Sequence, residues 1–342
     1  MTGAGAQMAA DMAAQPGTLA ALIDRRAAIA QALRPMQADP PVGAVICARG
    51  SSDYAAVFGR YALEGAIGRP VALAAPSLTT LYGVELDLRG WIAIGVSQSG
   101  RTPEIGTVLE RYAASGARAV AITNDAESPL AAAADVVVEL GAGRESSVPA
   151  TKTFTAELAA FALVAEALGG AELGARQWAA VPGAVERLLA DSAPAEAAAA
   201  TLADAQGLVC VARGYLLCIA LEAALKLREA AGLRAEGWST ADFRHGPVTL
   251  AGPDLPLIAV SAPGPAAADV AELAERLRGQ GTPVLRLATE PGSELRYEPG
   301  LPEPLATIPA AIRAQQLALA LALGRGLDPD RPPGLAKVTE TF

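Results

Sequence analysis

The sequence predicts an α/β protein with two parallel sheets, each covered by helices on both faces. Short apolar runs alternate with longer helical stretches, and strand-and-turn segments recur at one constant spacing. The chain has 342 residues, which is enough for about two domains. Near-continuous apolar strands are typical of parallel sheets buried on both faces. The expected architecture is a flavodoxin-like, three-layer αβα arrangement that occurs twice.

The elements of the first copy follow from hydrophobic periodicity. Residues 1–38 carry apolar side chains at helical spacing, which predicts one or two helices. Beyond them, short apolar runs predict strands at 42–48, 71–74, 91–96, 119–123 and 136–140. Longer amphipathic runs predict helices at 53–67, 104–114 and 153–168, with Pro103 favoured as the first residue of the second of these.

The second copy is predicted from an internal repeat. Cys-Ala-Arg-Gly at 47–50 lies 164 positions before Val-Ala-Arg-Gly at 211–214. The same offset relates the turn ending at Gly100 to the turn ending at Gly264, and Val120 to Val284. Three matches at one offset predict two copies of one domain.

Five consecutive parts are expected along the chain. They are an N-terminal helical segment (1–38), a first αβα domain (39–169), a helical linker (170–203), a second αβα domain (204–326) and a C-terminal arm (327–342). The linker is rich in alanine and is expected to be helical after Pro182. The arm is expected to be extended, because its prolines interrupt any helix.

Composition and charge argue against several classes of protein. The net charge is −9 and basic residues form no run, so we expect no nucleic-acid partner. The longest stretch without a charge, 70–84, is shorter than the ~20 apolar residues of a membrane span, so none is expected. The N-terminus lacks the order of a signal peptide. We therefore expect a cytoplasmic protein.

The three cysteines are Cys47, Cys210 and Cys218. Their number is odd, they lie in apolar surroundings, and no pair has the C-x-x-C spacing of zinc sites and redox pairs. They are interpreted as small buried hydrophobic residues. No metal and no cofactor are expected.

Lysine and histidine are scarce in this chain. Only Lys152, Lys226 and Lys337 occur among 27 basic residues, and His245 is the single histidine. A lysine kept where arginine is otherwise preferred is a candidate for chemistry that needs a deprotonated amine. The alternative that three lysines remain by chance stays open.

The turn after the strand at 91–96 predicts an anion site. Ser97, Gln98, Ser99 and Thr102 place hydroxyl and amide groups between a strand end and a helix start, where free N–H groups and the helix dipole attract phosphate. A single cap would need only one hydroxyl. Ser51 and Ser52, after Gly50, form a weaker second candidate.

Other phosphate and nucleophile motifs are absent or incomplete. The chain has neither a P-loop nor a G-x-G-x-x-G turn between a strand and a helix, so nucleotide binding is not supported. Gly95 to Ser99 nearly matches the G-x-S-x-G elbow of hydrolases, but the last glycine is serine. A serine hydrolase using His245 stays open as an alternative.

Three charged residues share one face of the helix that begins near Tyr215. Glu222, Lys226 and Glu229 occur at i, i+4 and i+7. Such spacing usually means a solvated ion pair. Here the neighbours are mostly alanine and leucine, and charges held in an apolar setting are site candidates. His245 is placed in a loop by the Gly-Pro that follows it.

Four segments carry a family resemblance. They are SQSGRT at 97–102, ATKTFT at 150–155, ALEAALKLREAAGLRAEGWSTADFRHGP at 220–247 and LAKVTETF at 335–342. Together they resemble the isomerase half of glucosamine-6-phosphate synthase, a pair of SIS (sugar isomerase) domains. The resemblance covers about residues 40–342.

The resemblance implies a role for each matching residue. Ser52, Ser97, Gln98, Ser99 and Thr102 would hold the sugar phosphate, and Val148 would line the same pocket. Glu229 would move a proton between C1 and C2, with Lys226 and Glu222 beside it. His245 would open the sugar ring, and Lys337 would form a Schiff base with the ketose carbonyl.

One departure from the synthase shapes the expected activity. The sequence begins Met1-Thr2-Gly3 and shows no cysteine-led glutaminase domain, so we expect no glutamine hydrolysis. The predicted function is an amino-sugar-phosphate isomerase/deaminase that converts glucosamine 6-phosphate to fructose 6-phosphate and ammonia. The open alternatives are an ammonia- or glutamine-dependent transaminase, a simple phosphosugar isomerase, a fructosamine-phosphate deglycase and a non-catalytic sugar-phosphate sensor.

The resemblance also implies an oligomer. Proteins of the family that this sequence resembles are homodimers with active sites at the subunit interface. The resemblance therefore implies that His245 would serve the site of the partner subunit. The expected ligand is a small sugar phosphate.

Overall fold

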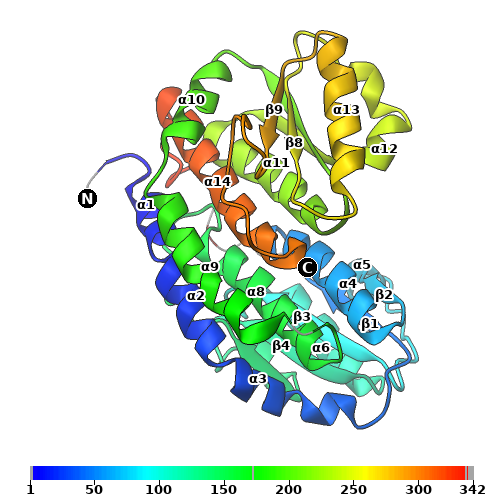
Figure 1. The fold of residues 1–342 in the computed structure, drawn as a ribbon. Coiled ribbons are helices and arrows are strands. Elements are labelled where there is room, and N and C mark those ends of the chain that lie inside the picture. The colour runs from blue at the N-terminus through cyan, green and yellow to red at the C-terminus, as the bar shows by residue number, and fades with distance from the viewer. Residues whose placement is uncertain (1–2, 172, 336, 338–342) are drawn as a thin grey trace. The chain divides into compact units, whose positions relative to one another are not determined.

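The computed structural model describes residues 3–171, 173–335 and 337, and it contains two parallel sheets (Figure 1). The described residues divide into two compact units. The first-sheet unit comprises residues 17–144 and 152–178, and the second-sheet unit comprises residues 3–16, 145–151, 179–335 and 337.

The first sheet has the strand order β2-β1-β3-β4-β5, and every neighbouring pair is parallel. Its strands are β1 (Ala44–Cys47), β2 (Val71–Leu73), β3 (Ile92–Ser97), β4 (Arg118–Thr123) and β5 (Val136–Glu139). This order is that of flavodoxin-like, doubly wound sheets. The predicted fold class and the five predicted strands are confirmed.

Helices surround the first sheet. They are α2 (Gln15–Asp24), α3 (Arg26–Ala32), the 3-10 helix η1 (Arg34–Gln37), α4 (Ser51–Ile67), α5 (Pro76–Thr80), α6 (Pro103–Ala114), α7 (Pro129–Ala132) and α8 (Lys152–Ala167). The chain crosses from β1 to β2 through α4, and from β3 to β4 through α6, in opposite directions along the sheet. Because such crossovers are right-handed, the two helices lie on opposite faces of the sheet. Gly59 lets α4 approach α8, because a Cβ there would lie 2.4 Å from the Phe161 ring.

The second sheet repeats this plan with the order β7-β6-β8-β9, again with parallel pairs throughout. Its strands are β6 (Gly207–Ala212), β7 (Arg234–Ser239), β8 (Leu257–Val260) and β9 (Val284–Leu287). Strands β6, β8 and β9 take the places that β1, β3 and β4 take in the first sheet. The predicted repeat is therefore confirmed at the level of topology.

The second-sheet unit contains the remaining helices, and α9 runs from one unit into the other. They are α1 (Ala6–Ala13), α9 (Gly174–Leu189), α10 (Ala193–Thr201), η2 (Gly214–Leu216), α11 (Leu217–Ala231), α12 (Thr240–Arg244), η3 (Pro247–Leu250), α13 (Ala267–Gly279) and α14 (Glu303–Gly324). Helix α13 packs on a core of strand residues that includes Val209, Leu257 and Ala259, and α11 packs against α14.

Two details differ from the sequence prediction. The N-terminal segment forms three α-helices and η1 rather than one or two helices, because short turns interrupt the periodic pattern. Helix α9 begins at Gly174 and contains Pro182, whereas helix was expected only after that proline. His245 lies in the short turn between α12 and η3, which agrees with the loop expected from Gly246-Pro247, although a short helix directly precedes it.

Helix α14 is buried inside its unit. In the described part of the chain it is the one helix long and apolar enough to cross a membrane by length and composition, although it contains Arg313. The structure buries 89% of its most apolar window, as expected for a core helix. Arg313 is itself 2% exposed and donates to the carbonyl oxygens of Asp191 and Arg296.

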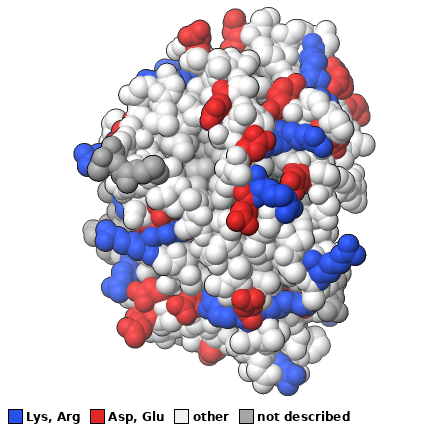
Figure 2. Space-filling view, turned by 60° about the vertical axis from the view of Figure 1, so that its left-hand side comes forward, with Lys and Arg blue, Asp and Glu red and all other residues white. Residues whose placement is uncertain are grey.

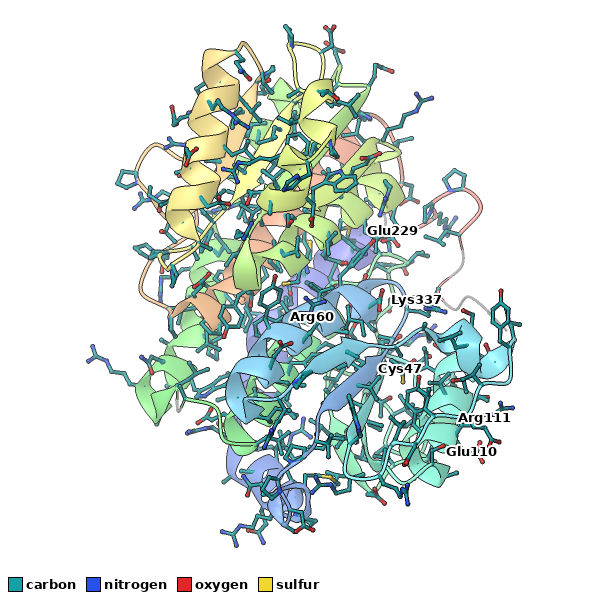
Figure 3. The ribbon with its side chains drawn as sticks, turned by 90° about the vertical axis from the view of Figure 1, so that its right-hand side faces the viewer. Cys47, Arg60, Glu110, Arg111, Glu229 and Lys337 are labelled. Carbon is teal, nitrogen blue, oxygen red and sulfur yellow. The ribbon has the colours of Figure 1, made fainter. Side chains whose placement is uncertain are left out.

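The cysteines behave as the sequence predicted. Cys47, Cys210 and Cys218 are all buried free thiols, and Cys47 lies in β1 inside the first sheet (Figure 3). Burial raises the pKa of Cys47 and of Cys210 to about 12. At neutral pH they are therefore unreactive thiols.

Candidate active site

The first sheet has its topological switch point at the carboxyl ends of β1 and β3. These strands are neighbours, yet β1 connects through α4 to one side of the sheet and β3 connects through α6 to the other. Doubly wound proteins bind ligands at such a topological switch point. Helices α4 and α6 both begin there, so their N-terminal N–H groups face the same region.

Ser97 and Thr102 lie on this turn and contact each other. Their hydroxyl oxygens are 3.1 Å apart, and Ser97 is 5% exposed. Thr102 is the residue before α6, and its side chain does not cap the helix. Pro103 is the first helical residue, as predicted. The structure therefore does not support reading the Thr102 hydroxyl as a simple cap, and a ligand can use it.

The turn between Ser97 and Thr102 depends on a glycine. Gly100 has a φ of +62°, and a Cβ there would lie 2.1 Å from the Ser128 hydroxyl oxygen. The Gln98 carbonyl accepts the Asn124 N–H, and the Ser99 hydroxyl accepts the Arg101 N–H. These bonds fix the turn and leave the Gln98 and Ser99 side chains half-buried beside it.

Ser51 and Ser52 open α4 on the neighbouring turn. Ser52 is 8% exposed, and its hydroxyl donates to a carboxylate oxygen of Glu157 on α8 at 2.8 Å. For the Ser52 hydroxyl to donate to a phosphate, it must therefore leave Glu157. Gly50 precedes the helix with a φ of +60°, which lets the backbone turn sharply from β1 into α4.

Helix α11 holds Glu222, Lys226 and Glu229 in a buried cluster. The Lys226 ammonium lies 3.3 Å from a Glu222 carboxylate oxygen and 2.5 Å from one of Glu229. The side chains of Lys226, Glu222 and Glu229 are 1%, 3% and 18% exposed. These charged groups are therefore buried and do not form a solvated surface pair. The side chain of Glu229, labelled in Figure 3, is the most exposed of the three.

The electrostatics of this cluster keep Lys226 charged. Burial acts to lower the pKa of Lys226, but the carboxylates of Glu222, Glu229 and Glu145 outweigh it, so the pKa is raised. Lys226 is therefore an ammonium ion at neutral pH. The raised pKa argues against Lys226 as the deprotonated amine among the three candidate lysines.

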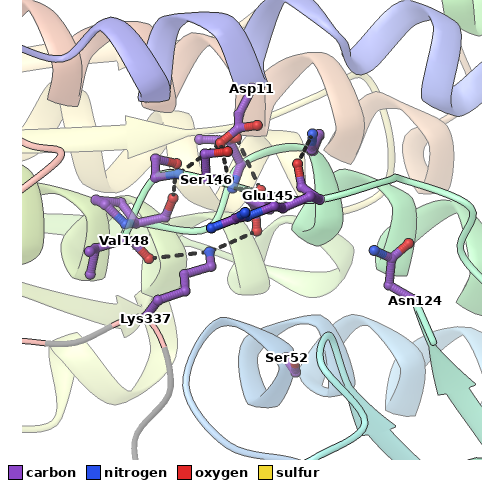
Figure 4. A network of polar contacts seen from close by, with 12 residues as sticks. Asp11, Ser52, Asn124, Glu145, Ser146, Val148 and Lys337 are labelled. Atoms are coloured by element: carbon purple, nitrogen blue, oxygen red, sulfur yellow. Dashed lines mark hydrogen bonds and ion pairs between the residues drawn. The ribbon is translucent and has the colours of Figure 1, made fainter. Parts of the chain in front are cut away.

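The loop between β5 and α8 adds a carboxylate that the sequence did not indicate. Glu145 is buried, and its carboxylate accepts the Thr151 N–H at 2.7 Å and pairs with the Lys337 ammonium at 3.1 Å (Figure 4). The Val148 carbonyl lies 3.5 Å from the same ammonium. The structure thereby brings Lys337 to Val148, both residues that the sequence singled out.

His245 lies apart from these contacts. It is exposed at the end of α12, and its ring has no hydrogen-bonding or ionic partner among the residues that the structure describes. The Arg244 guanidinium anchors α12 to Asp269 on α13 at 2.7 Å.

The predicted residues form two groups. Ser51, Ser52, Ser97, Gln98, Ser99 and Thr102 belong to the first-sheet unit. Val148, Glu222, Lys226, Glu229, His245 and Lys337 belong to the second-sheet unit. The first group contains neutral hydroxyl and amide groups, and the second contains carboxylates, amines and an imidazole. Over the described chain, no three His, Cys, Asp or Glu side chains are grouped to hold a metal ion.

The equivalent switch point of the second sheet is filled by a side chain. Glu303, the first residue of α14, lies so close to Gly264 that a Cβ there would meet its carboxylate at 2.2 Å. The same carboxylate lies near Gly214, the counterpart of Gly50. Burial raises the pKa of Glu303. The two copies thus differ: one presents hydroxyl groups at the switch point, and the other presents a carboxylate.

Surface charge is mixed on the face drawn in Figure 2. Lysine and arginine side chains are interspersed with aspartate and glutamate, without a broad field of one sign. This face therefore offers no general positive potential that would attract an anion.

The fold and these residues define a doubly wound α/β protein with a repeated domain, and comparison with known proteins identifies its family. The SIS domain model matches residues 43–167 and 201–304. The chain belongs to the SIS domain family, in its phosphosugar isomerase branch.

Three relatives illustrate the similarity. A glutamine–fructose-6-phosphate aminotransferase (isomerizing) of Methanothermobacter thermautotrophicus is 32% identical over 296 residues, covering 84% of this chain and 50% of the relative. A protein of Silicibacter pomeroyi DSS-3, provisionally named a phosphosugar isomerase, is 30% identical with a TM-score of 0.81, covering 95% and 99% of the two chains. A glucosamine-6-phosphate deaminase of Thermotoga maritima shares the fold at 21% identity, with a TM-score of 0.75 and coverage of 95% and 99%. The chain spans about half the length of the curated aminotransferases it matches.

Proposed function

We propose that this protein is an amino-sugar-phosphate isomerase that releases ammonia, with glucosamine 6-phosphate and fructose 6-phosphate as the preferred pair. The observation that carries the proposal is the buried cluster of the second-sheet unit. There Glu229 is held beside the Lys226 ammonium, and the Lys337 amine is held beside Glu145. A phosphate-binding protein without catalysis has no need for such a cluster.

The hydroxyl-lined turn is proposed to bind the phosphate group. Ser97 and Thr102 donate to phosphate oxygens together with the N–H groups that open α6. Gln98, Ser99, Ser51 and Ser52 are proposed to complete the phosphate site, with Val148 against the sugar. Contacts far from the reacting carbons supply binding energy that orients the open-chain sugar.

Proton transfer is proposed to run through His245 and Glu229. His245 protonates the ring oxygen as the C1 hydroxyl loses its proton, which gives the open-chain aldehyde. Glu229 removes the C2 proton and returns it to C1 while an N–H proton of the amine passes to the C1 oxygen, so the amino aldehyde becomes a C2 imine without net change in atoms. Lys226 stays charged beside Glu229 and orients that carboxylate, and Glu222 holds Lys226 from the other side.

Lys337 is proposed to act as the amine nucleophile. The Lys337 ammonium gives a proton to the imine nitrogen, and its freed nitrogen then adds to C2. A proton passes from the Lys337 nitrogen to the substrate nitrogen, which leaves as ammonia, and a carbon–nitrogen double bond to the enzyme remains. Water then adds to C2 and displaces Lys337, which yields the ketose phosphate and the free amine. The net reaction consumes one water and releases one ammonia.

The names of the relatives support this pair of sugars. Aminotransferases named for fructose 6-phosphate and a deaminase named for glucosamine 6-phosphate are both similar to this chain. The two names describe opposite directions between an amino-sugar phosphate and a ketose phosphate. We propose the direction that releases ammonia because it needs only water besides the sugar.

We further propose a cytoplasmic homodimer in which His245 serves the partner subunit. The exposed imidazole at the end of α12 supports this, because it is available to a second chain. The five-part division of the chain, with an N-terminal helical segment and a C-terminal arm around two SIS domains, is proposed in the same way. Sedimentation velocity would test the dimer, and mixing inactive Glu229→Gln with inactive His245→Ala chains would test shared sites by recovery of activity.

Ammonia release from a panel of amino-sugar 6-phosphates tests the proposed reaction. Wild type should release ammonia and form a ketose phosphate from glucosamine 6-phosphate. Glu229→Gln should lower kcat by at least about 100-fold, the lower range for a lost general base. Glu236→Gln is the matched control, because it makes the same change at an exposed carboxylate on β7.

Other outcomes would replace the proposal. Incorporation of free ammonia into fructose 6-phosphate without measurable release would identify an ammonia-dependent transferase. Aldose–ketose interconversion without nitrogen chemistry would identify a simple isomerase, and release from fructosamine phosphates alone would identify a deglycase. Tight binding of sugar phosphates with no turnover would identify a sensor.

A further inference from the structure

Glu145 is a buried carboxylate to which the proposed reaction gives no role. None of its side chain is exposed. One carboxylate oxygen accepts the Thr151 N–H at 2.7 Å and the Thr151 hydroxyl at 3.2 Å. The other oxygen faces the Lys337 ammonium at 3.1 Å. A charge removed from water this completely is retained only where it is paired and hydrogen-bonded.

The loop that carries Glu145 is fixed independently of Lys337. Asp11 accepts the N–H groups of Ser146 and Ser147 at 2.7 and 2.8 Å (Figure 4). The Thr151 carbonyl accepts a hydrogen bond from Gln315 on α14. The position of the Glu145 carboxylate is therefore set by its own loop, as a preorganised site requires.

Lys337 has the opposite character. It lies 192 positions from Glu145 in sequence, and its side chain is 27% exposed. An ammonium on a flexible four-carbon stem samples many rotamers unless a partner restrains it. Here the Glu145 carboxylate and the Val148 carbonyl both contact the Lys337 nitrogen. A fully buried partner restrains it far more than a surface ion pair would.

Glu145 also acts on the α11 cluster. Its charge is one of those that raise the pKa of Lys226. The same carboxylate thus interacts with both proposed functional lysines, one on α11 and one near the C-terminus. Its removal would affect the proposed nucleophile and the residue that orients Glu229.

We propose that Glu145 is the positioning residue for Lys337, holding the amine at one place so that it can attack C2 of the sugar. The covalent role of Lys337 rests on the proposed function, but its restraint by Glu145 does not. Two kinds of measurement separate these statements.

Amine labelling tests the restraint without any substrate. All three lysines are described, and Lys152 and Lys226 are 6% and 0% exposed, so an acylating reagent reaches chiefly Lys337. Peptide mass spectrometry follows its modification in wild type, Glu145→Gln and Glu145→Asp. Loss of the ion pair in Glu145→Gln should raise the labelling rate of Lys337 by about threefold or more, whereas Glu145→Asp should stay closer to wild type. Glu298→Gln, at an exposed carboxylate paired with Arg187, is the matched control.

Kinetics with glucosamine 6-phosphate test the consequence for catalysis. Glu145→Gln should lower kcat by about tenfold or more with little change in KM, because misplacing a reactive group affects the chemical step. Glu145→Asp keeps the charge and should recover part of kcat. Borohydride trapping of the Lys337 adduct with fructose 6-phosphate should fall in parallel with kcat.

The labelling result decides the proposal. Unchanged labelling of Lys337 in folded Glu145→Gln and Glu145→Asp would overturn it. Unchanged kcat in an active enzyme would overturn it as well. If wild type has no turnover while labelling rises as expected, the positioning by Glu145 stands and the proposed function is what fails.

Discussion

At the scale of single residues, Lys226 shows how surroundings decide the chemistry of a side chain. The scarcity of lysine in the sequence marks it as special, and its burial agrees with that. However, three carboxylates act on it, so its pKa is raised and it stays charged. A charged lysine cannot serve as a base, so the proposed function assigns the covalent chemistry to Lys337 instead.

Replacing Lys226 tests this arrangement through stability. Lys226→Met leaves the Glu222 and Glu229 carboxylates without their cation in a buried place, so we expect a loss of about 3–5 kcal/mol in the free energy of unfolding. Urea denaturation measures the loss. Arg187→Met, which removes an exposed ion pair with Glu298, should cost far less and is the control. A Lys226→Met protein as stable as the control would contradict the buried-pair interpretation.

The same variant should show a particular pH dependence. Because the pKa of Lys226 is raised on folding, its stabilising effect is complete below its ordinary pKa of about 10.4 and is lost as pH rises through the raised value. The stability gap between wild type and Lys226→Met should therefore be constant from neutral pH to mildly alkaline pH. It should narrow only above about pH 10.4, as followed by urea denaturation across the pH range. A gap that closed at neutral pH would mean that Lys226 is not held as an ammonium.

At the scale of elements, the proposed anion site lies at the switch point between β1 and β3. Two helices begin beside two adjacent strand ends, and the Ser97 and Thr102 hydroxyls meet at 3.1 Å within that frame. Neither hydroxyl is needed to cap α6. The turn therefore presents donors whose removal should affect ligand binding more than folding.

Ser97→Ala and Thr102→Val should weaken the binding of sugar phosphates. Each removes one neutral donor to a charged group, for which we expect about a tenfold rise in Kd and a small change in Tm. Isothermal titration with fructose 6-phosphate in a Glu229→Gln background measures binding without turnover. Thr107→Val, on the same helix away from the turn, is the control. Equal affinity in all variants would place the phosphate elsewhere.

The elements that the sequence predicted correctly are those with a strong periodic pattern. Strand β7 was not predicted, because Arg234, Glu236 and Gly237 interrupt any apolar run and the strand lies at the edge of its sheet. The sequence predicts helix only after Pro182, because proline is favoured near a helix start, whereas α9 begins at Gly174 and contains this proline in its interior. Glu145 was missed, because its importance comes from a contact with Lys337, 192 positions away, which no local pattern carries.

At the scale of the whole molecule, the two copies of the fold differ in the side chains at their switch points. The 164-residue offset predicted two sheets of one topology. The second turn, Ser261 to Gly264, has fewer side-chain donors than the first. The structure adds what the offset could not indicate. Glu303, from a helix outside the repeated strands, places its carboxylate against the glycines of the second switch point.

This asymmetry predicts that each chain binds one sugar phosphate. A phosphate at the second switch point would meet the Glu303 carboxylate instead of hydroxyl donors, and like charges repel strongly in a partly buried place. Isothermal titration with fructose 6-phosphate should give one site per chain in Glu229→Gln protein. That site should weaken with Ser97→Ala but keep its affinity with Glu303→Gln, since Glu303 belongs to the other copy. The prediction would be contradicted by two sites of similar affinity, or by a single site that responds to Glu303→Gln and not to Ser97→Ala. Either result would mean that the second copy binds sugar phosphate.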